Sequence, residues 1–415
     1  MPTTVDIGSV KFEEAISFFK GKLNLPTQYW DDLNAEVHAK AFTVAGATKN
    51  DLLMDLRNTV DQAISDGMSI GQFRKQFDGL VAKHGWNYKG KRGWRTRVIY
   101  DTNMRSAHMA GRWQQIQRVK ETRPYMQYQT VGDARVRPEH EAWDGLVLAI
   151  DDDFWITFYP PNGWGCRCTA RTLSPRQMRR EKLELSQAPA INYQRRINRK
   201  TGEDYGLVPQ GIDTGFDYNV GKAWLGPDTA LGEQVMRMPE ALRNQALNEA
   251  QTLSPKLSRA FSPWVNQLLD RKQPQGEIKT VGYLKPSIVS ALVERDQAPK
   301  TALITVTDKE IMHLLRDSKD GRHIPKDLVR AMPDAINNPK SILWDKRDPA
   351  VLYVFDAPGE DRKGKLVIRV NYKMKGKAAD GTRHTIRTNS LRTGGLVSIS
   401  NLKDKAFYDV LEGEL

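Results

Sequence analysis

Residues 125–174 read YMQYQTVGDARVRPEHEAWDGLVLAIDDDFWITFYPPNGWGCRCTARTLS, and this stretch organises the centre of the chain. It holds both cysteines, Cys166 and Cys168, and one of the seven histidines, His140. Short apolar runs alternate there with turn-forming clusters, a pattern typical of hairpins and irregular loops. The stretch therefore predicts a small β-rich unit. The expected strands are residues 126–131, 146–150, 154–159 and 168–173, with a turn at 160–163.

Cys166 and Cys168 are separated by one residue, so both side chains would lie on the same face of a strand. Two thiolates and the imidazole of His140 would supply three ligands of a structural zinc ion, and Asp133 or Asp144 the fourth. The alternative is a pair of small buried thiols beside a hydrogen-bonded histidine in a reducing compartment. Paired zinc-binding cysteines usually have two or more residues between them, so both interpretations stay open.

The runs GDARVRPEHEAWDG, DDDFW and PPNGWGCRCTARTLS resemble the core of the phage Mu protein F family of minor head proteins. The resemblance covers about residues 50–225. It implies a head-morphogenesis protein of a tailed phage, made in the host cytoplasm and carried in the virion near the portal. The implied partners are the portal, other capsid proteins and packaged DNA. The matching positions are Asp133, Arg135, His140, Gly145, Asn162, Gly163 and Arg167.

Composition describes an ordinary globular protein with a basic balance. Of 415 residues, 39% are hydrophobic and 27% charged, which argues against global disorder. The net charge of +13 favours a polyanionic partner, chiefly nucleic acid, although solubility alone would also explain it. Because no long apolar run and no basic-then-apolar leader occurs, we expect neither a membrane-spanning nor an exported protein. Two cysteines exclude a disulfide framework.

Outside the β-rich centre, apolar residues recur at helical spacing through most of the first 270 residues, and we divide this region into three parts. Residues 1–120 are expected to form a helical scaffold, 121–225 the β-rich core with a charged connector, and 226–270 a helical linker. The connector, residues 174–200, is either a solvated segment or a DNA contact. The principal domain boundary is expected at residues 271–276, which are polar and contain Pro and Gly. Within the scaffold, helices are expected at residues 12–19, 30–37, 50–67, 69–85 and 92–116.

Residues 276–415 predict a basic domain in which helices precede an antiparallel sheet. Between Arg362 and Arg392 there are ten basic residues and a single acidic one, Asp380. The expected fold class of the whole chain is therefore α+β and multidomain. The expected strands are residues 302–306, 341–344, 351–355, 366–372 and 384–388, with helices near 311–315 and 326–336.

This order of helix and basic sheet resembles the barnase/EndoU/colicin/RelE-like nuclease domains found fused to phage head proteins. The resemblance implies metal-independent cleavage of RNA, in which a histidine takes the proton of the ribose 2′-hydroxyl and basic side chains stabilise the phosphate. The alternative is a sheet that binds DNA or the portal without chemistry. The candidate catalytic residues are His313, His384, Arg369, Lys373, Arg387 and Thr388.

Three functional classes follow. The first is a structural head protein, the second a head protein that also carries a ribonuclease domain, and the third an accessory DNA-binding protein. A nucleotide-driven motor is excluded because the sequence has no phosphate-binding Gly-x4-Gly-Lys-Ser/Thr loop. A cysteine hydrolase is not expected, because Cys166 and Cys168 with one loop histidine lack an obvious orienting partner.

Overall fold

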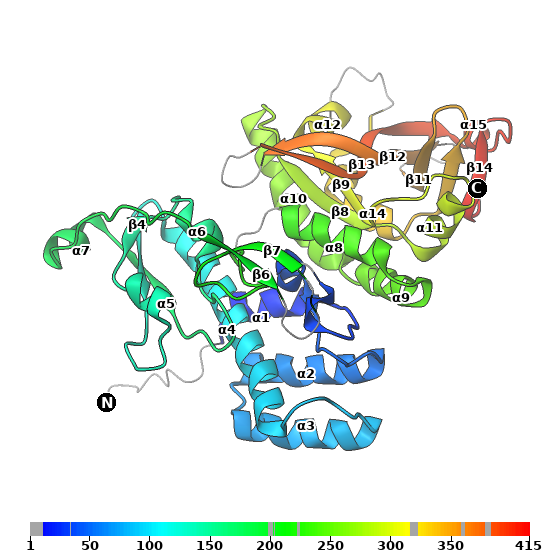
Figure 1. Ribbon diagram of the computed structural model, residues 1–415. Coiled ribbons are helices and arrows are strands. Elements are labelled where there is room, and N and C mark those ends of the chain that lie inside the picture. Colours follow the sequence, from blue (N-terminus) through cyan, green and yellow to red (C-terminus); the bar gives the residue numbers. More distant parts are fainter. Residues whose placement is uncertain are drawn as a thin grey trace, which may run out of the picture. The chain divides into compact units, whose positions relative to one another are not determined.

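The computed structural model describes residues 11–33, 35–197, 202, 204–221, 225–315, 323–357, 362–377 and 383–415. The chain divides into two compact units, of which the first ends at residue 222 and the second begins at residue 223 (Figure 1). Helices and several separate sheets occur, which confirms the expected multidomain α+β class. Within the described ranges, no helix has the length and apolar character that crossing a bilayer requires.

The first unit begins with four helices that share one apolar core. Three of them pack against the longest, α4, which spans 28 residues. Their ends follow from local sequence: Ser69 caps α3 in a box with Gln72, and Gly67 and Gly85 end α2 and α3 with φ of 69° and 58°. The helices are α1 (Glu13–Lys20), α2 (Asn50–Asp66), α3 (Ile70–His84) and α4 (Arg92–Val119).

The helix expected at residues 30–37 does not form. Two short 3-10 turns stand there, η2 (Trp30–Asp32) and η3 (Ala35–Ala39). The carboxylate of Asp32 accepts the backbone N–H groups of Gln28 and Tyr29 at 2.8 Å each. Such local side-chain bonds compete with helix formation. The turns lie between two short parallel strands, β1 (Leu23–Asn24) and β2 (Ala41–Phe42).

The β-rich centre is a three-stranded antiparallel sheet in the order β4-β3-β5. The strand expected at residues 154–159 is instead a short helix, α6, whose first N–H is accepted by Asp152 at 2.9 Å. An apolar run of this length does not distinguish strand from buried helix. The elements are β3 (Tyr125–Gln129), α5 (Pro138–Ala142), β4 (Val147–Ala149), α6 (Phe154–Thr157), β5 (Thr169–Leu173), α7 (Pro175–Arg180), β6 (Tyr193–Ile197) and β7 (Asp204–Pro209).

The second unit is built on a seven-stranded sheet in the order β14-β10-β11-β12-β13-β9-β8. All its pairs are antiparallel except β13 with β9. Helices α8 (Leu225–Arg237), α9 (Glu240–Gln251) and α10 (Ser254–Arg271) pack against β8 (Figure 1). The strands are β8 (Ile278–Tyr283), β9 (Leu303–Thr307), β10 (Ser341–Asp345), β11 (Ala350–Asp356), β12 (Arg362–Lys377), β13 (Arg383–Ser398) and β14 (Tyr408–Gly413). The remaining helices are α11 (Pro286–Val293), α12 (Asp308–Leu314), α13 (Lys326–Arg330), α14 (Met332–Asn337) and α15 (Ile399–Leu402).

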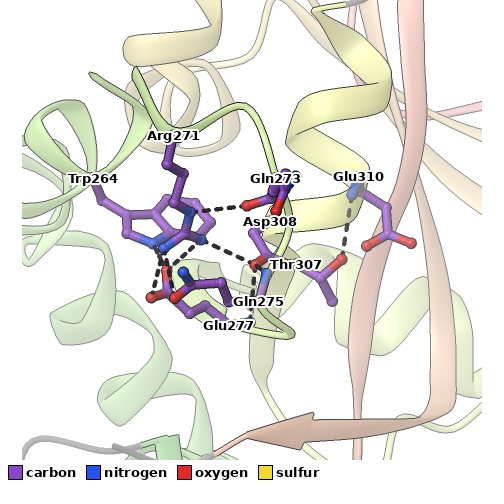
Figure 2. Close-up of polar contacts among 8 residues, drawn as sticks. All are labelled: Trp264, Arg271, Gln273, Gln275, Glu277, Thr307, Asp308 and Glu310. Carbon is purple, nitrogen blue, oxygen red and sulfur yellow. Dashed lines mark hydrogen bonds and ion pairs between the residues drawn. The ribbon is translucent and has the colours of Figure 1, made fainter. Parts of the chain in front are cut away.

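The boundary expected at residues 271–276 lies inside this second unit. Arg271, the last residue of α10, donates to Glu277 at 3.0 and 3.1 Å and to the buried Asp308 at 3.1 Å. Trp264 also donates to Glu277, at 2.5 Å, so one carboxylate joins the helix to the start of β8 (Figure 2). The polar Pro-Gly segment is therefore an exposed turn whose two ends are bonded to each other, and helices α8–α10 belong to the domain that they were expected to precede.

Candidate functional site

The three side chains predicted to bind zinc converge in the first unit. His140 lies on α5, Cys166 in the loop that precedes β5, and Cys168 directly before that strand. The Sγ atoms of Cys168 and Cys166 lie 3.4 and 3.8 Å from Nδ1 of His140. All three side chains are buried, and their ligand atoms lie within 4.8 Å of one another.

The hydrogen bond of His140 fixes which of its nitrogens faces the sulfurs. Nε2 lies 2.8 Å from the carbonyl oxygen of Gly211, which can only accept, so Nε2 carries the proton. In the neutral ring, Nδ1 then directs its lone pair toward Cys166 and Cys168. Gly211 is required at its position: its φ is +84°, and a Cβ there would lie 2.7 Å from the ring of Trp143.

The two thiols share a buried environment. The hydrogen bond with Cys168 lowers the pKa of Cys166, whereas the bond with Cys166, together with burial, raises the pKa of Cys168. A single negative charge is thus favoured on the pair, because two adjacent buried thiolates would repel one another. The Tyr128 hydroxyl is buried beside Cys168, makes no hydrogen bond of good geometry, and has its pKa raised by burial.

The two carboxylates expected to complete the zinc site lie elsewhere. Asp133 accepts two hydrogen bonds from Arg167, at 2.6 and 2.5 Å, and one from the backbone of Arg135 at 3.0 Å. The bonds from Arg167 lower the pKa of Asp133 to about 2. Asp144 accepts the backbone N–H of Thr130 at 2.7 Å. Neither carboxylate joins the His-Cys-Cys cluster; each instead accepts hydrogen bonds from neighbouring donors.

An ion pair that the sequence did not reveal organises the loop before the cysteines. Arg137 donates to Asp213 at 2.7 Å and to the carbonyl of Trp164 at 3.0 Å. The backbone N–H of Trp164 also donates to Asp213, at 2.8 Å. A Cβ on Gly163 would lie 2.3 Å from both Arg137 Nη1 and Asp213 Oδ2. Any larger residue in the Pro-Asn-Gly turn would therefore displace both partners of this ion pair.

The other motif residues have similar structural roles. Asn162 is fully buried and donates its side-chain amide to the carbonyl of Phe158 at 2.9 Å. Gly145 has φ of +80° in the turn between α5 and β4. Gly211 and Asp213 lie in the turn-rich run GIDTG, which was the one sequence signal that pointed to them. This run is distant in sequence from the motif whose His140 and Arg137 it binds.

A cavity of about 130 Å³ adjoins the cluster. All three candidate ligands line it. Arg135, Arg137 and Arg167 belong to the same lining. Arg137 and Arg167 are paired with Asp213 and Asp133, so the cavity combines two sulfurs and an imidazole with arginines that are largely neutralised.

The candidate catalytic residues of the second unit are distributed differently. Thr388 is fully buried, and its hydroxyl donates to the carbonyl of Leu303 at 3.2 Å. Arg369 is exposed and donates to both oxygens of Asp348 at 2.6 Å. Both residues already have protein partners, so neither presents a free group to a substrate.

The remaining candidates lie on two elements. Lys373 and Arg387 are cross-strand partners in β12 and β13. His313 is exposed on α12, and His384 pairs through its backbone with Gly376, while its side chain lies outside the described residues. Among the described side chains, the structure thus brings together Lys373 and Arg387 but gathers no histidine beside them.

The family described as "Phage Mu protein F like protein" matches residues 54–171. The capsid assembly protein F of Escherichia phage Mu is 31% identical over 441 aligned residues, which cover 97% of this chain and 95% of that protein. The chain belongs to the phage Mu protein F-like family. The FluMu F protein of a Mu-like prophage of Haemophilus influenzae is 29% identical over 351 residues, covering 78% of this chain and 84% of that one. No solved structure matches.

The match to the Mu F-like family begins in α2 and ends in β5, so it includes His140, Cys166 and Cys168. The resemblance to the family, drawn above from the motif of residues 133–167, is confirmed. None of these comparisons supports the resemblance of residues 276–415 to nucleases.

Proposed function

We propose that this chain is a capsid assembly protein that acts in head morphogenesis of a Mu-like phage or prophage. The observation that carries the proposal is the similarity over 97% of the chain to a protein of phage Mu with that name. Because the aligned region spans both compact units, the proposal concerns the whole chain. A capsid assembly role implies contact with other capsid proteins and a place in the phage head.

We propose further that the chain contacts packaged DNA through part of the hairpin formed by β12 and β13. β11 pairs with β12 as far as Ile368, and β9 pairs with β13 at Asn389 and Ser390. Residues 372–377 and 383–388 pair with each other beyond these points, and we call them the basic ribbon. A two-stranded ribbon has the width of the major groove of B-DNA.

The charges on the basic ribbon support an anionic ligand. Lys373 and Lys375 are exposed and alternate with the buried Met374 along β12. Arg387 lies directly opposite Lys373, and like charges at such positions repel one another. No described acidic side chain forms an ion pair with these three cations. Phosphate groups would relieve the repulsion, and their binding would release counterions.

Three neighbouring cations of the same sheet are already neutralised. Lys363 pairs with Asp356 at 2.5 Å, and Arg369 pairs with Asp348 at 2.6 Å. Arg392 pairs with Glu310 at 2.6 Å. The contrast favours the basic ribbon, rather than the sheet as a whole, as the DNA contact.

The place of the chain in the head is proposed from the family resemblance, which implies a position beside the portal. The test is a phage whose own gene is inactivated and which receives the wild-type chain or a variant without residues 125–174 in trans. We expect infectious particles with the wild type, and heads that are poorly infectious or lack the chain with the deletion. Imaging of a tagged wild-type chain should show it at one capsid vertex. Fully infectious particles assembled without the chain would refute the proposal.

A further inference from the structure

We propose that His140, Cys166 and Cys168 bind one zinc ion, and that a water in the adjoining cavity takes its fourth coordination position. The proposal concerns a site that is independent of the capsid assembly role. It rests on three observations: the distances between the ligand atoms, the fixed orientation of the imidazole, and the cavity that the three ligands line.

The distances fit a tetrahedral ion. With Zn–S of about 2.3 Å and Zn–N of about 2.0–2.1 Å, tetrahedral angles place nitrogen and sulfur about 3.6 Å apart. The observed separations between Nδ1 of His140 and the two sulfurs are 3.4 and 3.8 Å. Both lie within a few tenths of an ångström of that value. An ion can therefore enter between the three atoms without a rearrangement of α5 or of the loop before β5.

The imidazole is held in the form that binds metal. Nε2 donates to the carbonyl oxygen of Gly211 at 2.8 Å, which leaves Nδ1 as the nitrogen that faces the sulfurs. A second hydrogen bond of this kind is the usual support of a metal-bound histidine, because it fixes both the tautomer and the plane of the ring. Stacking on Trp143, with ring centroids 5.2 Å apart and planes 20° apart, restricts the ring further.

The ligand set selects the metal. Two sulfurs and one nitrogen suit zinc, whereas magnesium and calcium require oxygen ligands. Two thiolates and a neutral imidazole around Zn²⁺ carry no net charge, so a complete site can be buried without an unpaired ion. Within the described residues this is the single group of three or more His, Cys, Asp or Glu side chains whose ligand atoms converge in this way.

The fourth position is assigned to water because, within the described residues, no carboxylate converges with the three ligand atoms. Asp133 is bound by Arg167, and Asp144 by the backbone of Thr130. The cavity of about 130 Å³ that the three ligands line exceeds the space that one ordered water needs. Of the arginines that line it, Arg137 is paired with Asp213 and Arg167 with Asp133, which limits their repulsion of a zinc ion.

Zinc would link α5, which carries His140, to the segment between the Pro-Asn-Gly turn and β5. Cys166 and Cys168 follow His140 in the sequence by 26 and 28 residues. The apolar core around the ligands also includes side chains of α4, α6 and residues 212–220, so the ion would add a local link within a packed core. The ion would therefore act structurally, by holding the loop that carries Arg167.

The experiment uses the full chain, purified without a metal-binding tag. We expect about one zinc per chain by elemental analysis. Cobalt exchanged into the same protein should give the intense visible bands of a tetrahedral ion and a sulfur-to-cobalt charge-transfer band in the near ultraviolet. Cys168→Ser should lose the charge-transfer intensity of one thiolate and most of the bound zinc. Asp133→Asn is the matched control, because it changes a nearby acidic residue that this structure excludes as a ligand, and should keep the metal.

Two results would overturn the zinc site. One is wild-type protein with well under one zinc per chain and no cobalt bands. The other is a melting temperature that a strong chelator leaves unchanged. Both are read on the wild type, so they decide the matter even if Cys168→Ser fails to fold. Neither affects the capsid assembly proposal, which depends on phage complementation.

Discussion

Substitution of Gly163 by alanine tests the construction of the central motif. The added Cβ would lie 2.3 Å from Arg137 Nη1 and 2.3 Å from Asp213 Oδ2, whereas real Cβ contacts stay beyond 3.0 Å. Each group must therefore move by at least about 0.7 Å, the difference between these two values. Such a shift breaks the bond of Arg137 to Asp213 and that of Trp164 N–H to the same carboxylate.

The expected loss can be estimated from these contacts. Hydrogen bonds to charged groups contribute roughly 1.5–3 kcal/mol each when buried, but this ion pair is about a third exposed and is partly screened. Overpacking adds about 1–3 kcal/mol. We expect the free energy of unfolding of the first unit to fall by about 2–4 kcal/mol, which corresponds to a decrease of roughly 5–15 °C in melting temperature.

Calorimetry of the full chain measures this loss, because the two compact units are expected to unfold in separate transitions. Gly79→Ala is the matched control: it lies in α3, and its added Cβ would meet nothing within 4 Å. That variant should be neutral or more stable by up to about 1 kcal/mol. In the background of Asp213→Ala, the penalty of Gly163→Ala should shrink by at least about 1 kcal/mol, since one clashing group is gone. An equal penalty in both backgrounds would refute the reasoning.

Three further predictions concern the basic ribbon, the second unit and the Asp133 ion pair. Replacing Lys373 and Arg387 with alanine should weaken DNA binding and reduce the slope of log binding constant against log salt concentration by about 0.9 per lost phosphate contact. Arg369→Ala should change this slope little, because Arg369 is already paired with Asp348. Equal slopes for both variants in fluorescence titrations would contradict the ribbon contact. Incubated with RNA and chelator, the full chain should bind without cutting, because Thr388 is buried and Arg369 is paired; cleavage that His313→Ala abolishes would establish the ribonuclease hypothesis instead. The pKa of Asp133 is lowered to about 2, so its stabilising contacts are complete above pH about 4 and are lost as pH falls toward 2. Asp133→Asn should therefore reduce the fall in melting temperature over this pH range. An unchanged fall would count against the ion pair.

The sequence predicted those elements whose signals are local. Helices α2 and α3 end where Gly67 and Gly85 adopt positive φ, and the three candidate zinc ligands, all from one recognisable motif, lie together. Each of these features depends on residues that are close together in sequence or on one recognisable motif.

The features that the sequence could not predict depend on distant partners. The hydrogen bond of His140 to Gly211 joins residues 71 positions apart, and that of Arg137 to Asp213 joins residues 76 apart. No periodicity links such pairs. The same reason explains the boundary wrongly placed at residues 271–276, where composition resembles a linker but Arg271 is bound across the turn to a buried carboxylate.

The basic ribbon also bears on how copies of the chain avoid one another. Beyond Ile368, β12 leaves one edge whose N–H and C=O groups are paired with no described strand. Such an edge is a template on which a second chain can add a strand, and proteins commonly block it with lysine. Lys373 and Lys375 stand at this edge, so two ribbons that approach side by side meet charge repulsion before backbone pairing begins. The charges that suit a polyanion thereby also oppose pairing of the chain with further copies through its sheet edge.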